Sequence, residues 1–245
     1  MSPSSFSREQ AFSRLFHVTA EKYWKGYQKT GGLIDAEGEA FLSSIGYTVE
    51  EFFDFIEDYV GVTGESISLY RKAAEQGDLL AQRALGYIYT HGLGITRDEP
   101  QGFFWYRQAA ERGDAASQNV IGYAYASGVG LAQDYAQAAF WYRKAAEQGE
   151  INAQSGLGFL YADGHGVDQD YAQAVHWYLK AAEAGSAYAQ FYLAYHYRDG
   201  QGISKDDVQA IFWFRKAAAQ GNAYATEELA RLERPGLDAS PQGGT

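Results

Sequence analysis

The stretch Tyr70-Arg71-Lys72-Ala73-Ala74-Glu75-Gln76-Gly77 returns four times further along the chain, with small changes. Its copies cover residues 106–113, 142–149, 178–185 and 214–221, so the interval is 36 residues at every step. A fixed period of about 20–50 residues is typical of repeat proteins, in which each unit buries its apolar face against its neighbours. The stretch therefore predicts a repeat array rather than a single closed core.

Each unit contains two helical patterns, named here helix A and helix B. In the first full unit, helix A follows the N-cap residue Asp78 and ends at Gly92, which can adopt the left-handed conformation that closes a helix. Helix B follows Asp98 and ends at Gly113. Apolar residues recur in both helices at the i, i+3, i+4, i+7 spacing of a buried face. One tryptophan per unit is expected in the core: Trp105, Trp141, Trp177 and Trp213.

The all-α array is predicted over residues 64–233, with a lone helix B at 64–76 and a lone helix A at 223–233. Residues 1–63 hold four further helical patterns, at 7–17, 20–29, 36–45 and after the capping box Thr48-Val49-Glu50-Glu51. They resemble no family and are expected to form a helical cap, because the end of a solenoid exposes apolar surface. Residues 234–245 are rich in Pro, Gly and Ser and are predicted to be a disordered tail.

The composition argues against several classes of protein. A formal net charge of -11 and a pI of about 4.9 disfavour a nucleic-acid binder, which needs a basic patch. The chain has no cysteine, no run of about 18 apolar residues and no apolar signal segment, so we expect a cytoplasmic protein with no membrane span. Its five histidines show no metal-ligand spacing, and no catalytic or cofactor-binding motif occurs. We therefore predict no enzyme, no metal site and no cofactor.

The third unit carries the repeat motif most completely, in the residues Ala153-Gln154, Leu157-Gly158, Tyr161, Gly164, Gly166, Asp170, Ala174, Trp177-Tyr178, Lys180-Ala181-Ala182-Glu183 and Gly185. This motif resembles the Sel1-like repeat, a longer relative of the tetratricopeptide repeat, over about 170 of the 245 residues. The resemblance implies a right-handed α-solenoid of about four to five repeats that binds proteins or peptides, most often in bacteria. Gly102, Ala194 and Phe214 depart from the motif in ways that packing tolerates. The absence of cysteine sets the chain apart from the disulfide-containing members.

The predicted binding surface is the face of helix A opposite its core residues. Its central position is aromatic in all four full units, and the resemblance implies that helix A lines the concave groove of the solenoid. Aromatic rings in a groove are typical anchors of protein interfaces. Two alternatives stay open, because the rings could pack against neighbouring A helices or residues 1–63 could fill the groove. The predicted partner-binding residues are Arg83, Tyr87, His91, Asn119, Tyr123, Phe159, Phe191 and Tyr195.

A second outward stripe follows the B helices and is also largely aromatic. It either packs between adjacent B helices or forms a surface for a partner or a second copy of the chain. The stripe consists of Phe104, Phe140, His176 and Phe212.

These features favour a non-enzymatic scaffold or adaptor that binds a protein or an extended peptide segment in its groove. An acidic inhibitor or immunity-type protein that masks a basic partner is an alternative, since the net charge of -11 fits it too. Strong salt dependence of association would distinguish that alternative. A further alternative is an enzyme with its site in residues 1–63. The sequence sets neither the identity of the partner nor the oligomeric state.

Overall fold

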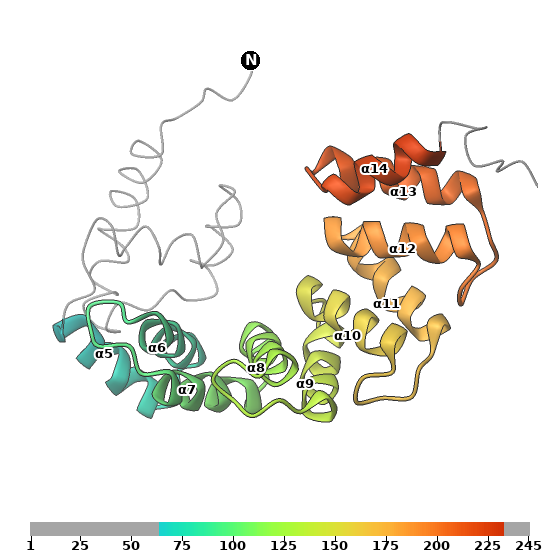
Figure 1. Cartoon of the computed structure of the whole chain (residues 1–245). Helices are drawn as coiled ribbons and strands as arrows, with labels where there is room; N and C mark the ends of the chain where they lie inside the picture. Colours follow the sequence, from blue (N-terminus) through green and yellow to red (C-terminus); the bar gives the residue numbers. More distant parts are fainter. Residues whose placement is uncertain (1–63, 233–245) are drawn as a thin grey trace, which may run out of the picture. The chain divides into compact units, whose positions relative to one another are not determined.

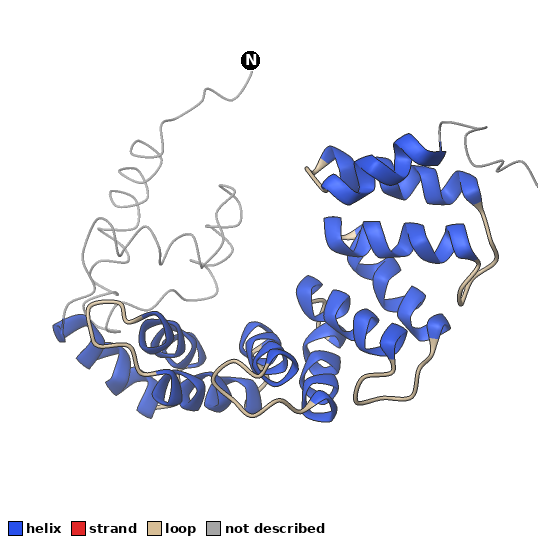
Figure 2. Ribbon diagram, viewed as in Figure 1, coloured by secondary structure: helices blue, strands red, loops and turns tan. Residues whose placement is uncertain are grey.

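The computed structural model describes residues 64–232, and all regular structure in this range is helical (Figure 1, Figure 2). Ten α-helices occur there, and no strand is found among these residues. The predicted all-α repeat fold is therefore confirmed for the array. The helical patterns and the cap predicted in residues 1–63, and the tail predicted at 234–245, lie outside the described residues.

The chain divides into two compact units, Met1–Arg112 and Gly113–Thr245, named unit 1 and unit 2. In the labels of Figure 1, even numbers are A helices and odd numbers are B helices. Unit 1 contains α5 (Gly64–Glu75), α6 (Leu79–His91) and α7 (Glu99–Glu111). Unit 2 contains α8 (Ala115–Ser127), α9 (Tyr135–Glu147), α10 (Ile151–Asp163), α11 (Tyr171–Glu183), α12 (Ala187–Asp199), α13 (Asp207–Ala219) and α14 (Ala223–Leu232).

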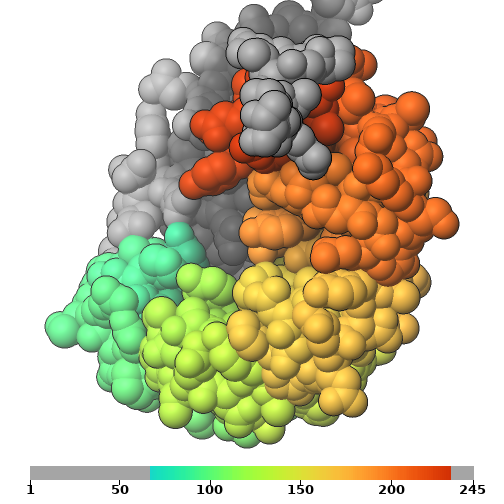
Figure 3. Space-filling view, turned by 45° about the vertical axis from the view of Figure 1, so that its right-hand side comes forward, coloured from blue at the N-terminus to red at the C-terminus, as the bar shows by residue number. Residues whose placement is uncertain are grey.

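Within unit 2, each B helix packs against the A helix before it and the A helix after it. Thus α9 contacts α8 and α10, α11 contacts α10 and α12, and α13 contacts α12 and α14. A direct contact also joins the A helices α8 and α10. Figure 3 shows the side chains of successive repeats meeting along this unit, from yellow-green α8 and α9 to orange α12 and α13. The A helices therefore form one layer of unit 2 and the B helices the other.

A buried glutamine in each of three A helices closes the B helix that precedes it. Carbonyl groups in the last turn of a helix have no partner within that helix. The glutamine side chain donates to one of them and so ties the two helices together. The pairs are Gln82 with Ala74, Gln154 with Ala146 and Gln190 with Ala182, at 3.0, 3.2 and 3.0 Å from Nε2 to the carbonyl oxygen.

A glycine on helix A lets the tyrosine that opens the repeated stretch approach closely. A Cβ atom added to Gly86 would lie 2.7 Å from the ring of Tyr106, which is closer than such contacts allow. Gly158 faces the ring of Tyr178 in the same way, at 2.9 Å. Each pair joins the A and B helices of one repeat. The tyrosine that opens the repeated stretch therefore has its ring in the core.

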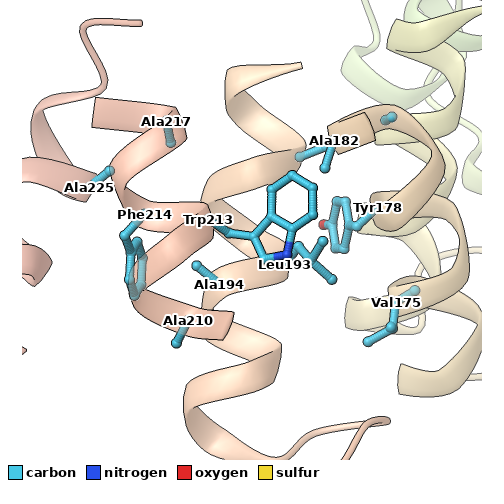
Figure 4. Close-up of a cluster of buried hydrophobic side chains, with 13 residues drawn as sticks. Val175, Tyr178, Ala182, Leu193, Ala194, Ala210, Trp213, Phe214, Ala217 and Ala225 are labelled. Atoms are coloured by element: carbon cyan, nitrogen blue, oxygen red, sulfur yellow. The ribbon is translucent and has the colours of Figure 1, made fainter. Parts of the chain in front are cut away.

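The core of unit 2 between α11, α12 and α13 is built around Trp213 (Figure 4). The indole of Trp213 comes from α13 and lies among Tyr178 of α11 and Leu193 of α12, all of them buried. The other three repeat tryptophans are buried as well, with exposed fractions of 5–8%. Trp177 of α11 belongs in the same way to a buried cluster with residues of α9 and α10, so within unit 2 these rings join consecutive repeats.

Candidate protein-binding surface

Three of the predicted binding residues belong to unit 1 and lie on α6. Arg83 and Tyr87 are half-buried, whereas His91 is exposed and is the last residue of the helix. The ring centroids of Tyr87 and His91 are 4.0 Å apart, and Nδ1 of His91 lies 3.0 Å from the carbonyl oxygen of Tyr87. Residues four apart share a helix face, so α6 presents a Tyr–His pair one turn after Arg83.

The other five predicted residues lie in unit 2, and the two on α8 and the one on α10 differ in exposure. Tyr123 of α8 is 59% exposed, and Asn119, one turn before it, is half-buried. Phe159 of α10 is half-buried and packs against both hydrophobic clusters of unit 2. The repeat therefore places an aromatic ring at the same helix position twice, but only the ring of Tyr123 faces solvent over more than half of its surface.

On α12 the predicted rings belong to a larger aromatic cluster. The ring centroid of Phe191 lies 4.8 Å from that of Tyr195, and the two lie 5.9 and 5.3 Å from the buried ring of Phe214 on α13. Tyr224 of α14, which is 70% exposed, extends the cluster at 6.2 Å from Phe191. Phe191 and Tyr195 therefore contribute to packing as well as to the surface.

Sequence reasoning missed two tyrosines of α12, Tyr188 and Tyr192. Their ring centroids are 4.6 Å apart, and Tyr192 lies 5.6 Å from Tyr178 of α11. Burial raises the pKa of Tyr178 and of Tyr188, and Tyr192 and the carboxylate of Asp163 add to both shifts. The signal in the sequence is composition, because α12 holds five aromatic residues against two in α10.

An arginine connects α12 to α14 beside this cluster. The guanidinium of Arg198 donates from Nε and Nη2 to the two carboxylate oxygens of Asp199, at 2.7 and 2.9 Å, and from Nη1 to Glu228, at 2.8 Å. Its Cζ atom lies 4.2 Å from the ring centroid of Tyr195. These hydrogen bonds hold the pKa of Asp199 below its usual range. A paired carboxylate and an aromatic face are the partners that a guanidinium favours.

His196 occupies a core position of α12, where α10 has Leu160. Its side chain is 5% exposed, and Nδ1 lies 2.9 Å from the carbonyl oxygen of Gln201. The rings of Tyr171 and Tyr178 lie 5.8 and 5.7 Å from its ring. Burial lowers the pKa of His196, although the Gln201 carbonyl and the carboxylate of Asp199 oppose the shift.

Acid pH is expected to weaken the fold of unit 2 through His196. Because its pKa is lower in the folded state than the ordinary value of about 6.5, the folded state binds the proton less tightly than the unfolded chain. Stability is therefore full above that value and falls as the pH drops below it. We expect the free energy of unfolding in urea to fall between about pH 7.5 and about pH 5.5, and to fall less for His196→Leu than for the native chain. The control His176→Leu, at an exposed position, should lose as much unfolding free energy over this pH range as the native chain. The same loss in His196→Leu would contradict this assignment.

The aromatic stripe of the B helices packs largely on its own helices. Phe140 and Phe212 are 47% and 45% exposed, and each ring meets the following tryptophan edge-on, at 5.1 and 5.0 Å between centroids. The ammonium groups of Lys144 and Lys216 lie 4.6 and 4.9 Å from the two phenylalanine rings. A lysine one turn later thus covers part of each ring through a cation–π contact.

Among residues 64–232, no three His, Cys, Asp or Glu side chains are grouped so that they could hold a metal ion. None of the helices in this range is long and apolar enough to cross a membrane. What the A-helix face of unit 2 does offer is aromatic rings, carboxylates and phenol hydroxyls, which are groups that bind peptide side chains.

Helix–turn–helix units of 36 residues, joined by core tryptophans and capping glutamines, define an α-solenoid repeat protein. The Sel1 repeat model matches residues 62–78, 79–114, 115–150, 151–186 and 187–222. The chain therefore belongs to the Sel1 repeat family. Sel1 repeats are generally protein-interaction scaffolds rather than enzymes.

Solved structures of bacterial proteins are similar to this chain. The protective antigen c5321 of uropathogenic Escherichia coli is 38% identical with a TM-score of 0.66, and the match covers 69% of this chain but 36% of that one. A Sel1 repeat protein from Oxalobacter formigenes is 37% identical with a TM-score of 0.63, and the match covers 73% of this chain and 74% of that one. A match to immunity protein Pa5087 from Pseudomonas aeruginosa has 22% identity and a TM-score of 0.43, over 66% of this chain and 60% of that one. No curated protein matches the sequence.

Proposed function

We propose that unit 2 binds an extended segment of a partner protein along the face of α8, α10 and α12. The observation that carries this proposal is the ring of Tyr123, which is 59% exposed at the repeat position where α10 and α12 hold the half-buried rings of Phe159 and Tyr195. An exposed ring beside half-buried ones offers a partner an apolar anchor. Membership of a family of interaction scaffolds supports the same function.

The spacing of the rings sets the length of the segment. Packed helices lie about 10 Å apart, so the three A helices span on the order of 20 Å. An extended chain advances roughly 3.3 Å per residue, so about six residues would reach from Tyr123 to Tyr195. Asn119 of α8, half-buried one turn before Tyr123, can hydrogen-bond the backbone of such a segment.

Tyr123→Ala is expected to weaken the binding of such a segment about 30-fold, which corresponds to about 2 kcal/mol for an aromatic anchor. The probe is a 12-residue peptide selected, from a displayed library of random sequences, for binding to the full chain. Its affinity is measured by fluorescence polarisation. The variant should have the same denaturant midpoint of unfolding as the native chain, because the ring is exposed and little packing is lost.

The matched control is Phe140→Ala, which removes a ring of comparable exposure from the B-helix face. It should leave the affinity for the peptide unchanged. If no peptide is selected, or if the selected peptides bind Tyr123→Ala as well as the native chain, the A-helix face is not the binding surface. Binding that ignores Tyr123 and collapses with added salt would point instead to masking of a basic partner.

A further inference from the structure

Unit 2 contains a site that already holds an arginine, where α12 meets α14. The guanidinium of Arg198 lies against the ring of Tyr195 and is paired with the carboxylates of Asp199 and Glu228. The site therefore has three parts: an aromatic ring in the second half of an A helix, a carboxylate on the last residue of that helix, and a carboxylate from the next A helix.

One repeat earlier, where α10 meets α12, the ring and the helix-end carboxylate are present, Tyr192 stands at the position of Glu228, and the arginine is absent. A shift of 36 residues places Phe159 at the position of Tyr195 and Asp163 at the position of Asp199. Ala162, partly buried against the α12 cluster, stands at the position of Arg198, so this position supplies no guanidinium to Asp163. Gln169 stands at the position of Lys205, and its amide donates to the Ala162 carbonyl oxygen and the Tyr171 hydroxyl rather than to Asp163.

The surroundings of Asp163 are suited to a cationic side chain. The carboxylate is 46% exposed, and its one basic neighbour within 4 Å among the described residues is His165, with Nδ1 at 3.9 Å from Oδ2. Phe159 lies on the same face of α10, and the His165 ring stands 5.9 Å from the Phe159 ring. From α12, Tyr188 lies close enough to this carboxylate for the charge to raise the pKa of Tyr188, and the ring of Tyr192 lies 4.6 Å from that of Tyr188. Aromatic faces and edge hydroxyls around a carboxylate attract a cation from two directions.

The position of Asp163 in its helix is a second, independent indication. Asp163 is the last residue of α10, where the partial negative charge of the helix end disfavours a carboxylate. Asp199 ends α12 in the same way, but two hydrogen bonds from Arg198 offset that repulsion. A charge placed where it weakens its own helix is expected when it serves a ligand.

We propose that the surface between α10 and α12 binds an arginine side chain of the partner segment, with its guanidinium paired to Asp163 and placed against Phe159, Tyr188 and Tyr192. The net charge of -11 favours a partner of opposite charge. This inference rests on the proposed function and adds to it the chemistry of the residue that the segment must carry.

The test uses the full chain and the tripeptide acetyl-Gly-Arg-Gly-amide as the probe, followed by the backbone amide signals in NMR. The arginine peptide should shift the signals of Phe159, Asp163, Tyr188 and Tyr192 in a saturable way. The citrulline peptide, which has the same shape without the charge, should bind at least about tenfold more weakly. Equal shifts from both peptides, or none from the arginine peptide, would overturn the assignment.

Three variants locate the site. Asp163→Asn should weaken binding of the arginine peptide about tenfold, while the matched control Asp199→Asn, whose carboxylate is already paired with Arg198, should leave it unchanged. Ala162→Arg should abolish binding, because the new guanidinium takes the place of the ligand and reproduces the arrangement of α12. Native affinity in Asp163→Asn or in Ala162→Arg would show that the arginine binds elsewhere.

Failure here is distinguishable from failure of the proposed function. If the selected 12-residue peptides require Tyr123 but bind Asp163→Asn with native affinity, the A-helix face binds segments and the arginine site is wrong. If the arginine peptide requires Asp163 but no selected peptide requires Tyr123, the arginine site holds and the extended binding mode is wrong.

Discussion

Replacing Trp213 with alanine is expected to lower the free energy of unfolding of unit 2 by about 3–5 kcal/mol. The indole is 6% exposed and belongs to a buried cluster that includes Tyr178 of α11 and Leu193 of α12. Its removal exposes apolar surface on three helices and leaves a cavity that these helices can close only in part. The loss is one of packing and includes no hydrogen bond, because the indole nitrogen is buried without a hydrogen-bond partner among the described atoms.

Guanidinium chloride unfolding followed by far-ultraviolet circular dichroism measures the effect. Phe212→Ala is the matched control, because Phe212 is the adjacent residue on α13 and is 45% exposed. It should cost less than about 1 kcal/mol. A loss of similar size in both variants would show that Trp213 does not hold the repeats together. If the slope of the transition falls along with its midpoint, α13 and α14 unfold separately from the rest of the unit.

The 36-residue period made most of the fold predictable. Helix boundaries follow from residues whose chemistry is local, such as the left-handed Gly92 and Gly128, both with φ of 75°, and the capping carboxylate of Asp114. Glu150 shows the limit of residue-type reasoning. Glutamate is a weak N-cap, yet its carboxylate accepts a hydrogen bond from the Ala153 amide at 2.6 Å. The repeat fixes the backbone of that turn, so the longer side chain can fold back onto the first turn of α10.

The candidate surface was less predictable, because exposure depends on neighbours that are distant in sequence. Periodicity correctly places Tyr123, Phe159 and Tyr195 at one helix position. It does not say that Phe214 lies against Tyr195 or that Phe159 packs against two clusters, since both depend on the side chains that the next repeat brings. Only Tyr123 keeps more than half of its surface exposed, so the binding prediction falls on that residue.

The arginine site could not be found from the sequence for a related reason. Ala162 and Asp163 are ordinary residues at the end of a helix, and a motif search passes over them. The contrast appears only when Arg198 is seen on the Tyr195 ring with its bonds to Asp199 and Glu228. Internal repeats thus provide their own comparison, because one copy shows which group the equivalent position of another copy can hold.

Replacing Gly166 with alanine is expected to destabilise unit 2 by about 2–5 kcal/mol. Gly166 lies in the loop between α10 and α11 with φ of +70°, a conformation that side chains disfavour. A Cβ atom there would also lie 2.2 Å from the carbonyl carbon of Tyr135, in the first turn of α9. That contact is with the backbone of a helix, which cannot move aside as a side chain would. The third repeat would therefore have to shift on the second.

Gly149→Ala separates the two contributions to this loss. Gly149 also has a positive φ, of +94°, but a Cβ atom there meets nothing within 4 Å. It should therefore cost only the backbone term of about 1–2 kcal/mol. Gly202 and Tyr171 are the equivalents of Gly166 and Tyr135 in the next repeat. Gly202→Ala should therefore behave like Gly166→Ala, because its Cβ atom would lie 2.3 Å from the carbonyl carbon of Tyr171. Denaturant unfolding of the three variants measures the difference, and equal losses at Gly166 and Gly149 would mean that the loop does not fix the contact between repeats.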